Sequence, residues 1–322
     1  MMTVDMRERR PEAQSRSGET AGGAARRQAR ERRRLSWLTS GPLIVVLLLL
    51  LVFPFVFNIW VSLTGWQINQ GDWWKAPWIG LDNYQDALTD SRLWGSLLRT
   101  SLVTLVCVLV EGGIGLVLAL CFAEKFRGRA LLMGVTIVPM MILPVVNGFI
   151  FFMLFQSDGP VNDILRTDKA WLNDPWSALF VVALSDIYQW TPLMFLIMLA
   201  GYNAVPPNLR SAATVLGASR WQEFRYVVLP LMRPVIVIAL IIRAIEAFKL
   251  FDPVFILTGG GPGTSTETIS VYLYKVAFND FRLGYAAALA LVVLILLSIV
   301  GMRAVEQVEG RVKSQKEETV DE

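Results

Sequence analysis

A short stretch rich in glycine, Leu257–Thr268, has the residue types of a phosphate-binding loop. Its sequence, LTGGGPGTSTET, places Gly259, Gly260, Gly261 and Pro262 ahead of a run of hydroxyl side chains. A nucleotide-binding loop of the G-x-x-x-x-G-K-[ST] type also needs a lysine and a preceding strand. This stretch contains no lysine. Its role then depends on the side of a membrane on which it lies.

Ionisable residues interrupt the apolar segments of the chain. Glu111 stands in the middle of one segment, and Arg243, Glu246 and Lys249 follow at i, i+3 and i+6 in another. Such groups are costly inside a membrane and usually face a cavity or one another. The spacing lets Glu246 pair with either neighbour. One interpretation is a structural cluster that neutralises itself, and the other is a polar wall of a translocation path.

A second polar set, Asp186, Gln189 and Trp190, lies on a further apolar segment. It combines a carboxylate and an amide with an aromatic ring, the groups that suit a sugar. Asn147 follows a proline closely and either packs or caps a broken helix, with packing the preferred interpretation.

Histidine is absent, which excludes His-based catalytic triads and histidine metal sites. Cys107 and Cys121 would lie about 21 Å apart on one helix, too far for a disulfide. A four-cysteine zinc site is excluded as well, so we expect no metal and interpret both cysteines as packing residues.

Membrane spans must position these residues. Apolar residues make up 54% of the 322-residue chain and charged residues only 18%. Several apolar runs reach the roughly 20 residues that a transmembrane helix needs. The sequence predicts an all-α polytopic membrane protein with six transmembrane helices within residues 37–303. The predicted spans are 43–61, 97–122, 131–155, 178–199, 231–251 and 285–302.

Basic residues predict the orientation, because they mark cytoplasmic flanks. Residues 1–36 form a basic tail that we expect to be disordered and cytoplasmic. The connectors 123–130 and 203–229 also carry basic residues and should lie inside, as should the C-terminal tail 304–322. The glycine-rich stretch then falls outside, where nucleotide is not available, and we predict a tight turn at an outer gate.

The connector 203–229 carries a pattern of two short helices. Pro206 and Pro207 suit a helix start, and Gly217 suits its end. Ser219 and Gln222 form a capping box for a second helix, and the prolines at 230 and 234 are expected to kink the entry to the fifth span. The connector either docks another protein or lies on lipid headgroups.

The sequence SAATVLG, nine residues and VVLP resembles the EAA loop of permeases of type I ABC importers, E-A-A-x-x-x-G, nine residues and I-x-L-P. Ser211 replaces the acidic residue, Leu216 the frequent Asp and Val227 the Ile. The segments 78–88, 190–207 and 248–278 are similar to the sugar-uptake branch of this family. The matching positions are Ala212, Ala213, Gly217, Leu229 and Pro230.

The resemblance implies a subunit that is not itself an enzyme, has no catalytic residue and binds no cofactor. It implies a second permease, two ATPase subunits that use ATP and Mg²⁺ and dock on the connector, and an extracellular sugar-binding protein. It also implies a bacterial or archaeal cytoplasmic membrane, contact with lipid and no nucleic-acid partner. By position, Glu246, Ala247 and Leu250 would lie nearest to the substrate path, with Arg243 beside them.

Two other classes of protein remain as alternatives. An ion- or proton-coupled secondary transporter is suggested by Glu111 and the charges of the fifth span, although no inverted repeat supports it. An intramembrane enzyme has less support, because no Ser–Lys or Asp–Asp pair stands out at matching depths.

Overall fold

The computed structural model describes residues 40–318, without the side chains of residues 70, 304–305 and 307–318. The predicted disordered tail 1–36 lies outside these residues. Contacts divide the chain into two compact units, Met1–Trp60 and Val61–Glu322. In the first unit the described residues belong to one long apolar helix, Ser40–Ser62, which includes α2 (Phe53–Ser62).

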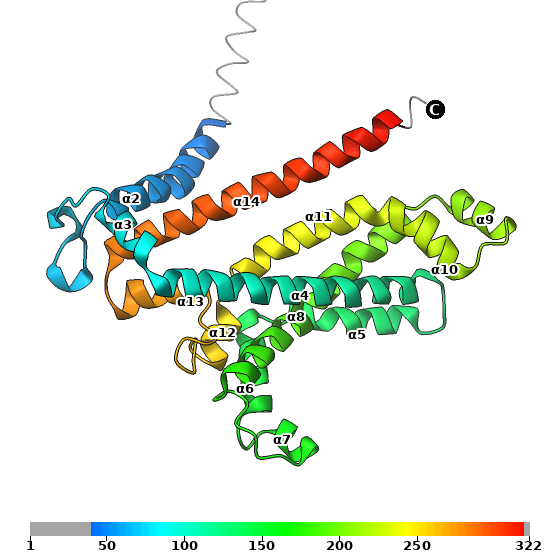
Figure 1. Ribbon diagram of the computed structural model, residues 1–322, viewed down its shortest axis with the longest axis horizontal. Coiled ribbons are helices and arrows are strands. Elements are labelled where there is room, and N and C mark those ends of the chain that lie inside the picture. The colour runs from blue at the N-terminus through cyan, green and yellow to red at the C-terminus, as the bar shows by residue number, and fades with distance from the viewer. Residues whose placement is uncertain (1–39, 319–322) are drawn as a thin grey trace, which may run out of the picture. The chain divides into compact units, whose positions relative to one another are not determined.

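The second unit is built from helices (Figure 1). Within residues 40–318 there is no β-strand, and Thr64 and Trp78 form only an isolated bridge. The predicted all-helical fold is thus confirmed for the described residues. The helices are α3 (Asp82–Thr89), α4 (Ser91–Ala123), α5 (Arg129–Met141), α6 (Pro144–Phe155), α7 (Pro160–Leu165), α8 (Pro175–Asn203), α9 (Pro207–Val215), α10 (Arg220–Glu223), α11 (Leu229–Phe248), α12 (Asp252–Leu257), α13 (Ile269–Tyr274) and α14 (Leu283–Glu318).

Five helices of the described chain are long and apolar enough to cross a membrane, and a bent pair makes a sixth if it counts as one span. The pair is α5 and α6, which meet at an angle of 96°. The third span, predicted as one helix over 131–155, is therefore broken. The five unbroken helices are Ser40–Ser62, Ser91–Ala123, Pro175–Asn203, Arg220–Phe248 and Leu283–Arg303.

Pro144 explains the break in the third span. The residue before a proline is pushed out of the helical region, and Leu143 is extended, with φ −61° and ψ 138°. A broken helix leaves backbone groups that need partners inside a membrane. Gln189 of α8 supplies one, because its Nε2 donates to the Ile142 carbonyl at 2.8 Å.

Helices α4 and α8 pack against each other more extensively than any other pair in the described chain. Gly115 allows this close approach. A Cβ atom at this position would lie 2.8 Å from the backbone nitrogen of Phe195, so a larger residue would force the helices apart. The α4–α8 pair forms the centre of the second unit, and α11 packs against both helices.

The fifth span begins inside the connector. Helix α10, a π-helical stretch Phe224–Val228 and α11 follow without interruption, and Pro230 and Pro234 lie in α11. The helix ends at Phe248, so Leu250 lies just beyond the span that was predicted to reach residue 251. At the C-terminus, α14 continues through the predicted tail to Glu318.

Candidate functional site

Three charged side chains from three helices meet in the centre of the second unit. Arg243 of α11 donates through Nε to Glu111 Oε2 of α4 at 2.6 Å and through Nη2 to Glu111 Oε1 at 3.0 Å. Its Nη2 also donates to the Asp186 carboxylate of α8. All three side chains are at most 2% exposed. We call Glu111, Asp186 and Arg243 the central cluster.

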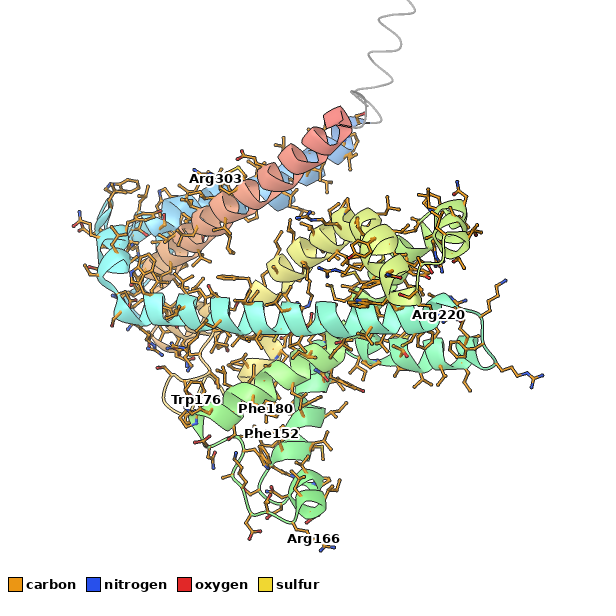
Figure 2. The ribbon with its side chains drawn as sticks, turned by 45° about the vertical axis from the view of Figure 1, so that its right-hand side comes forward. Phe152, Arg166, Trp176, Phe180, Arg220 and Arg303 are labelled. Carbon is orange, nitrogen blue, oxygen red and sulfur yellow. The ribbon has the colours of Figure 1, made fainter. Side chains whose placement is uncertain are left out.

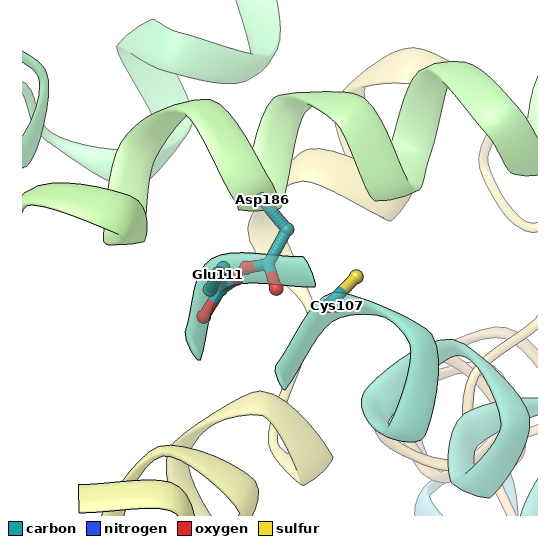
Figure 3. A group of neighbouring side chains, drawn as sticks. All are labelled: Cys107, Glu111 and Asp186. Atoms are coloured by element: carbon teal, nitrogen blue, oxygen red, sulfur yellow. The ribbon is translucent and has the colours of Figure 1, made fainter. Parts of the chain in front are cut away.

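The central cluster holds two carboxylates against one guanidinium. The Trp190 ring lies under this guanidinium, 5.4 Å from ring centroid to Cζ. Cys107 is close as well, and its sulfur and the two carboxylates offer ligand atoms within 4.8 Å of one another (Figure 3). Because the guanidinium already bonds both carboxylates, the arrangement serves as a charged tie between α4, α8 and α11.

Other residues predicted for the substrate path lie apart from this cluster. Gln189 is buried and accepts a hydrogen bond from Asn147 Nδ2 at 3.1 Å. Asn147 also donates to the Ser185 carbonyl, so it ties α6 to α8 and does not cap α6. Glu246 pairs with Lys249 at 2.8 Å and not with Arg243, because the Arg243 guanidinium is bonded to Glu111 and Asp186.

Among the residues predicted for the path, most are sealed in this conformation. Only the Glu246 side chain, 51% exposed, and part of Trp190 reach the surface of this chain. The buried members of the set are Asp186, Gln189, Arg243, Ala247 and Leu250.

The connector forms two capped helices. Pro207 is the first residue of α9, and Gly217, with φ +82°, turns the chain after its last residue. Gly217 N donates to Thr214 O and Ala218 N to Ala213 O, the pair of bonds that closes a helix through a left-handed glycine. Ser219 and Gln222 form the expected capping box.

Helix α9 is anchored at one side and open at the other. Arg210 Nε bonds Glu223 Oε1 at 2.7 Å, and its guanidinium stacks over the Tyr202 ring at 4.6 Å, which ties α9 to α10 and α8. At its tip, Val215 and Leu216 are each 86% exposed. The predicted docking residues are Ser211, Ala212 and Ala213 on α9, Leu216 and Gly217 after it, and Leu229 and Pro230 in the first turn of α11.

The glycine-rich stretch forms a compact turn closed by its own threonines. Thr258 Oγ1 and Thr266 Oγ1 lie 2.6 Å apart, and Thr266 Oγ1 donates to the Gly261 carbonyl at 2.8 Å. Gly259 and Gly260 have φ of +59° and +91°, and Gly260 N donates to Thr258 Oγ1. Thr268 then caps α13. We call residues 257–268 the Gly loop.

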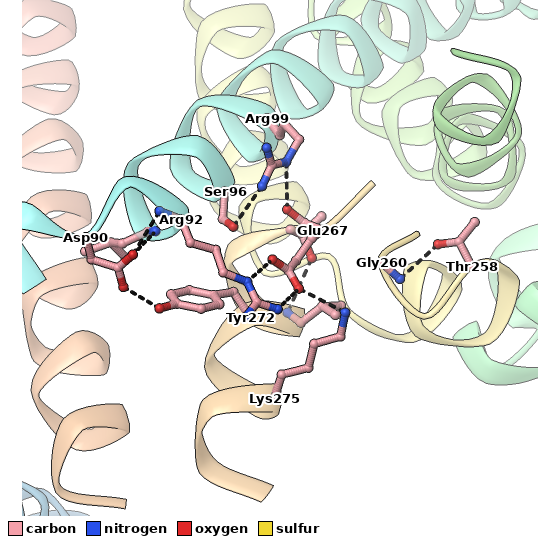
Figure 4. A network of polar contacts seen from close by, with 12 residues as sticks. Asp90, Arg92, Ser96, Arg99, Thr258, Gly260, Glu267, Tyr272 and Lys275 are labelled. Atoms are coloured by element: carbon pink, nitrogen blue, oxygen red, sulfur yellow. Dashed lines mark hydrogen bonds and ion pairs between the residues drawn. The ribbon is translucent and has the colours of Figure 1, made fainter. Parts of the chain in front are cut away.

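Beside the Gly loop lies a second ionic group (Figure 4). Glu267 accepts two hydrogen bonds from Arg92 of α4, both at 2.8 Å, and one from Lys275 Nζ at 2.9 Å. Arg99 Nε donates to the Glu267 carbonyl at 3.2 Å. We call Arg92, Glu267 and Lys275 the Gly-loop cluster, because it fastens the loop to the start of α4.

Asp90, the N-cap of α4, extends this arrangement. Its carboxylate accepts hydrogen bonds from the hydroxyls of Tyr272 and Tyr285 and from the backbone N–H groups of Arg92 and Leu93. Burial raises the pKa of Asp90, but these hydrogen bonds outweigh it and hold the pKa below its usual range. The start of α4 is therefore fixed to α13 and α14 through a charged carboxylate.

The central cluster, the Gly-loop cluster and the Asp90 contacts were not predicted as assemblies. Glu111, Asp186 and Arg243 stood out singly, because an ionisable residue in an apolar segment is conspicuous. Their mutual contact joins positions up to 132 residues apart, and no spacing rule connects them. Arg92, Glu267 and Lys275 lie outside the predicted spans, where a charged residue is not conspicuous, so the sequence carried no signal for that cluster.

The chain is similar to several transport proteins. It is 33% identical to the trehalose/maltose transport system permease protein MalF of Thermococcus litoralis, over 86% of this chain and 94% of that protein. It is 31% identical to the trehalose transport system permease protein SugA of Mycobacterium tuberculosis, over 81% of this chain and 84% of that protein.

A solved structure has the same fold. It is a crystal structure of a bacterial ABC transporter involved in the import of the acidic polysaccharide alginate, with a TM-score of 0.75 at 22% identity, covering 88% of this chain and 98% of that one. Residues 112–314, including most of the helices described above, match a family model. The chain belongs to the family of binding-protein-dependent transport system inner membrane components.

Proposed function

We propose that this chain is a permease subunit of an ATP-driven ABC importer for a sugar, an oligosaccharide or a related polyol. The family and the two relatives named for trehalose or maltose support this proposal. They favour it over the secondary transporter. The importer would contain a second permease, two ATPase subunits that use ATP and Mg²⁺, and a saccharide-binding protein, in the cytoplasmic membrane of a bacterium or archaeon.

We infer that the end carrying α9 faces the cytoplasm and that the Gly loop faces outward. The basic residues of the connectors support this orientation.

The exposed tip of α9 is the observation that carries the proposal. Two large apolar side chains, Val215 and Leu216, point away from this chain while caps and the Arg210–Glu223 pair hold the helix in place. Apolar residues presented on a rigid helix suit a groove of another protein. A push on α9 would pass through α10 and the continuous helix into the fifth span.

The test replaces Leu216 with Asp in the assembled transporter. Leu216 has little contact with its own chain, so folding and membrane insertion should be unchanged. A charge in the centre of an interface should weaken ATPase-subunit binding by about 2 kcal/mol or more, roughly 30-fold. The measurement is co-purification of the ATPase subunits, together with saccharide uptake. Ile164→Asp is the matched control for co-purification, because Ile164 is 78% exposed on α7, a different helix from α9.

Gly217→Val tests the same surface through the backbone. A β-branched residue is strained at φ +82°, so the turn after α9 should shift. We expect ATP hydrolysis without matching uptake, with the amount of inserted protein unchanged. Normal uptake by both variants would refute docking through α9.

A further inference from the structure

A cavity of about 440 Å³ lies between two loops at the end of the second unit that carries the Gly loop. One wall is the connection from α6 to α8, residues 156–173, and the other is the start of the Gly loop with Leu257 and Thr258. Figure 2 shows this region, with Phe152 on α6 and Arg166 at the far tip of the connection. The volume falls within the roughly 300–1,000 Å³ of small-molecule sites.

The first wall is fixed by a buried asparagine. Asn162 Nδ2 donates to the carbonyls of Ser157 and Lys169, both at 2.9 Å, and its Oδ1 accepts from Trp171 Nε1 at 2.8 Å. The Trp171 carbonyl accepts a further bond from Ser177 Oγ at 2.7 Å. Trp171 is therefore held at both its ring and its backbone.

Aromatic rings line the cavity on the side of the α6–α8 connection. The Trp171 ring meets the Phe155 ring edge to face, with centroids 5.7 Å apart and planes at 82°. Phe152 adds a third ring, 38% exposed. The second wall is also held by hydrogen bonds, since Thr258 Oγ1 bonds Thr266 Oγ1 and accepts from Gly260 N. The cavity is thus formed before any ligand enters.

Two amide side chains on the rim have no partner of their own. Gln156 and Asn173 line the cavity, and neither side chain makes a hydrogen bond to any residue within the described range 40–318. Each amide offers two donors and one acceptor. Aromatic rings beside amides with free donors and acceptors suit a ligand that has an apolar face and hydroxyl groups around its edge. A pyranose ring has both.

We propose that this cavity is an entry subsite for one sugar unit of the transported saccharide. The inference rests on the proposed function, and it adds where the saccharide first binds and which residues contact it. Phe152 and Trp171 would pack on the sugar ring, with buried Phe155 supporting Trp171, and Gln156 and Asn173 would bond its hydroxyls. A sugar bound here touches both the connection between the third and fourth spans and the loop between the fifth and sixth, so it bridges the two parts of the outer mouth.

The test measures protection of a cysteine by saccharide in the complete transporter. Asn173→Cys is introduced in a Cys121→Ser background and labelled with a membrane-impermeant thiol reagent, with and without trehalose or maltose. Arg166→Cys, at the tip of the same connection but outside the cavity lining, is the matched control. Uptake of the same two sugars by the wild-type transporter is measured in parallel.

We expect an imported sugar to slow labelling at position 173 severalfold and to leave position 166 unchanged. Adding Gln156→Ala should raise the sugar concentration for half-protection about 3- to 10-fold, the effect of one hydrogen bond. Glutamine at the same concentration should not protect.

Each other outcome overturns the inference in a recognisable way. If the wild type imports a sugar that does not protect position 173, the subsite is wrong and the proposed function stands. If sugar-free binding protein protects as well as loaded binding protein, the cavity is a protein-docking surface. If the wild type imports neither sugar, the proposed function fails for these substrates and the subsite fails with it.

Discussion

The two ion clusters of this chain are built with opposite charge balance. The central cluster sets one guanidinium, 1% exposed, against two carboxylates, whereas the Gly-loop cluster sets one carboxylate against two cations. In the latter, Arg92 is 40% and Lys275 20% exposed, so water still reaches both cations.

This difference in burial decides what each cluster contributes. Removing one charged side chain from a fully buried cluster leaves the remaining charges with neither a counter-charge nor water, which is strongly destabilising. A half-exposed partner can return to water. We therefore interpret the central cluster as a set of ion pairs that the packing of α4, α8 and α11 requires. The Gly-loop cluster, in contrast, positions a loop and contributes less to stability.

Arg243→Met should have the largest effect on this comparison. It leaves Glu111 and Asp186 buried without a counter-charge, and breaking such a group costs about 3–5 kcal/mol. Thermal unfolding of the purified transporter should show a large loss of stability. The triple variant Arg243→Met, Glu111→Gln, Asp186→Asn should recover part of that loss, because no unpaired charge remains. A single variant as stable as the wild type would contradict the tie.

Glu267→Gln should have an intermediate effect of about 1.5–3 kcal/mol, since it removes charged hydrogen bonds to Arg92 and Lys275. It also predicts a pH dependence. Burial raises the pKa of Glu267, but the bonds from Arg92 and Lys275 outweigh it and leave the pKa below its usual range.

The sign of the pH dependence follows from this lowered pKa. The stabilising contribution is complete above the unfolded-state pKa of about 4.3 and is lost as the pH falls through the lower folded-state pKa. Below about pH 4 the wild type should lose stability faster than Glu267→Gln, whose amide does not titrate. Parallel curves for the two proteins in thermal unfolding would show that the ionised carboxylate contributes nothing.

Lys249→Met should have the smallest effect. Lys249 and Glu246 are 59% and 51% exposed, and exposed pairs contribute about 0.2–1 kcal/mol. The variant is also a control for Arg243→Met, because both replace a cation near the same end of α11. A loss in unfolding stability as large as that of Arg243→Met would remove the distinction drawn from burial.

The sequence by itself determined the local features of this protein. Apolar runs predicted the spans, and proline, glycine and the Ser219–Gln222 pair predicted the ends of the connector helices, because these effects act over a few residues. The tight turn of the Gly loop followed in the same way, from glycines that accept positive φ. Family membership also came from a local spacing.

Only the tertiary structure decided the contacts between distant segments. Arg243 bonds Glu111 and Asp186 and leaves Glu246 to Lys249, and the i, i+3 spacing allowed either pairing. The break at Leu143 became tolerable because Gln189, on another helix, bonds the freed Ile142 carbonyl. These pairings depend on which helix faces pack against each other. The helical period of a sequence shows which residues share a face, but it does not show which other helix that face contacts.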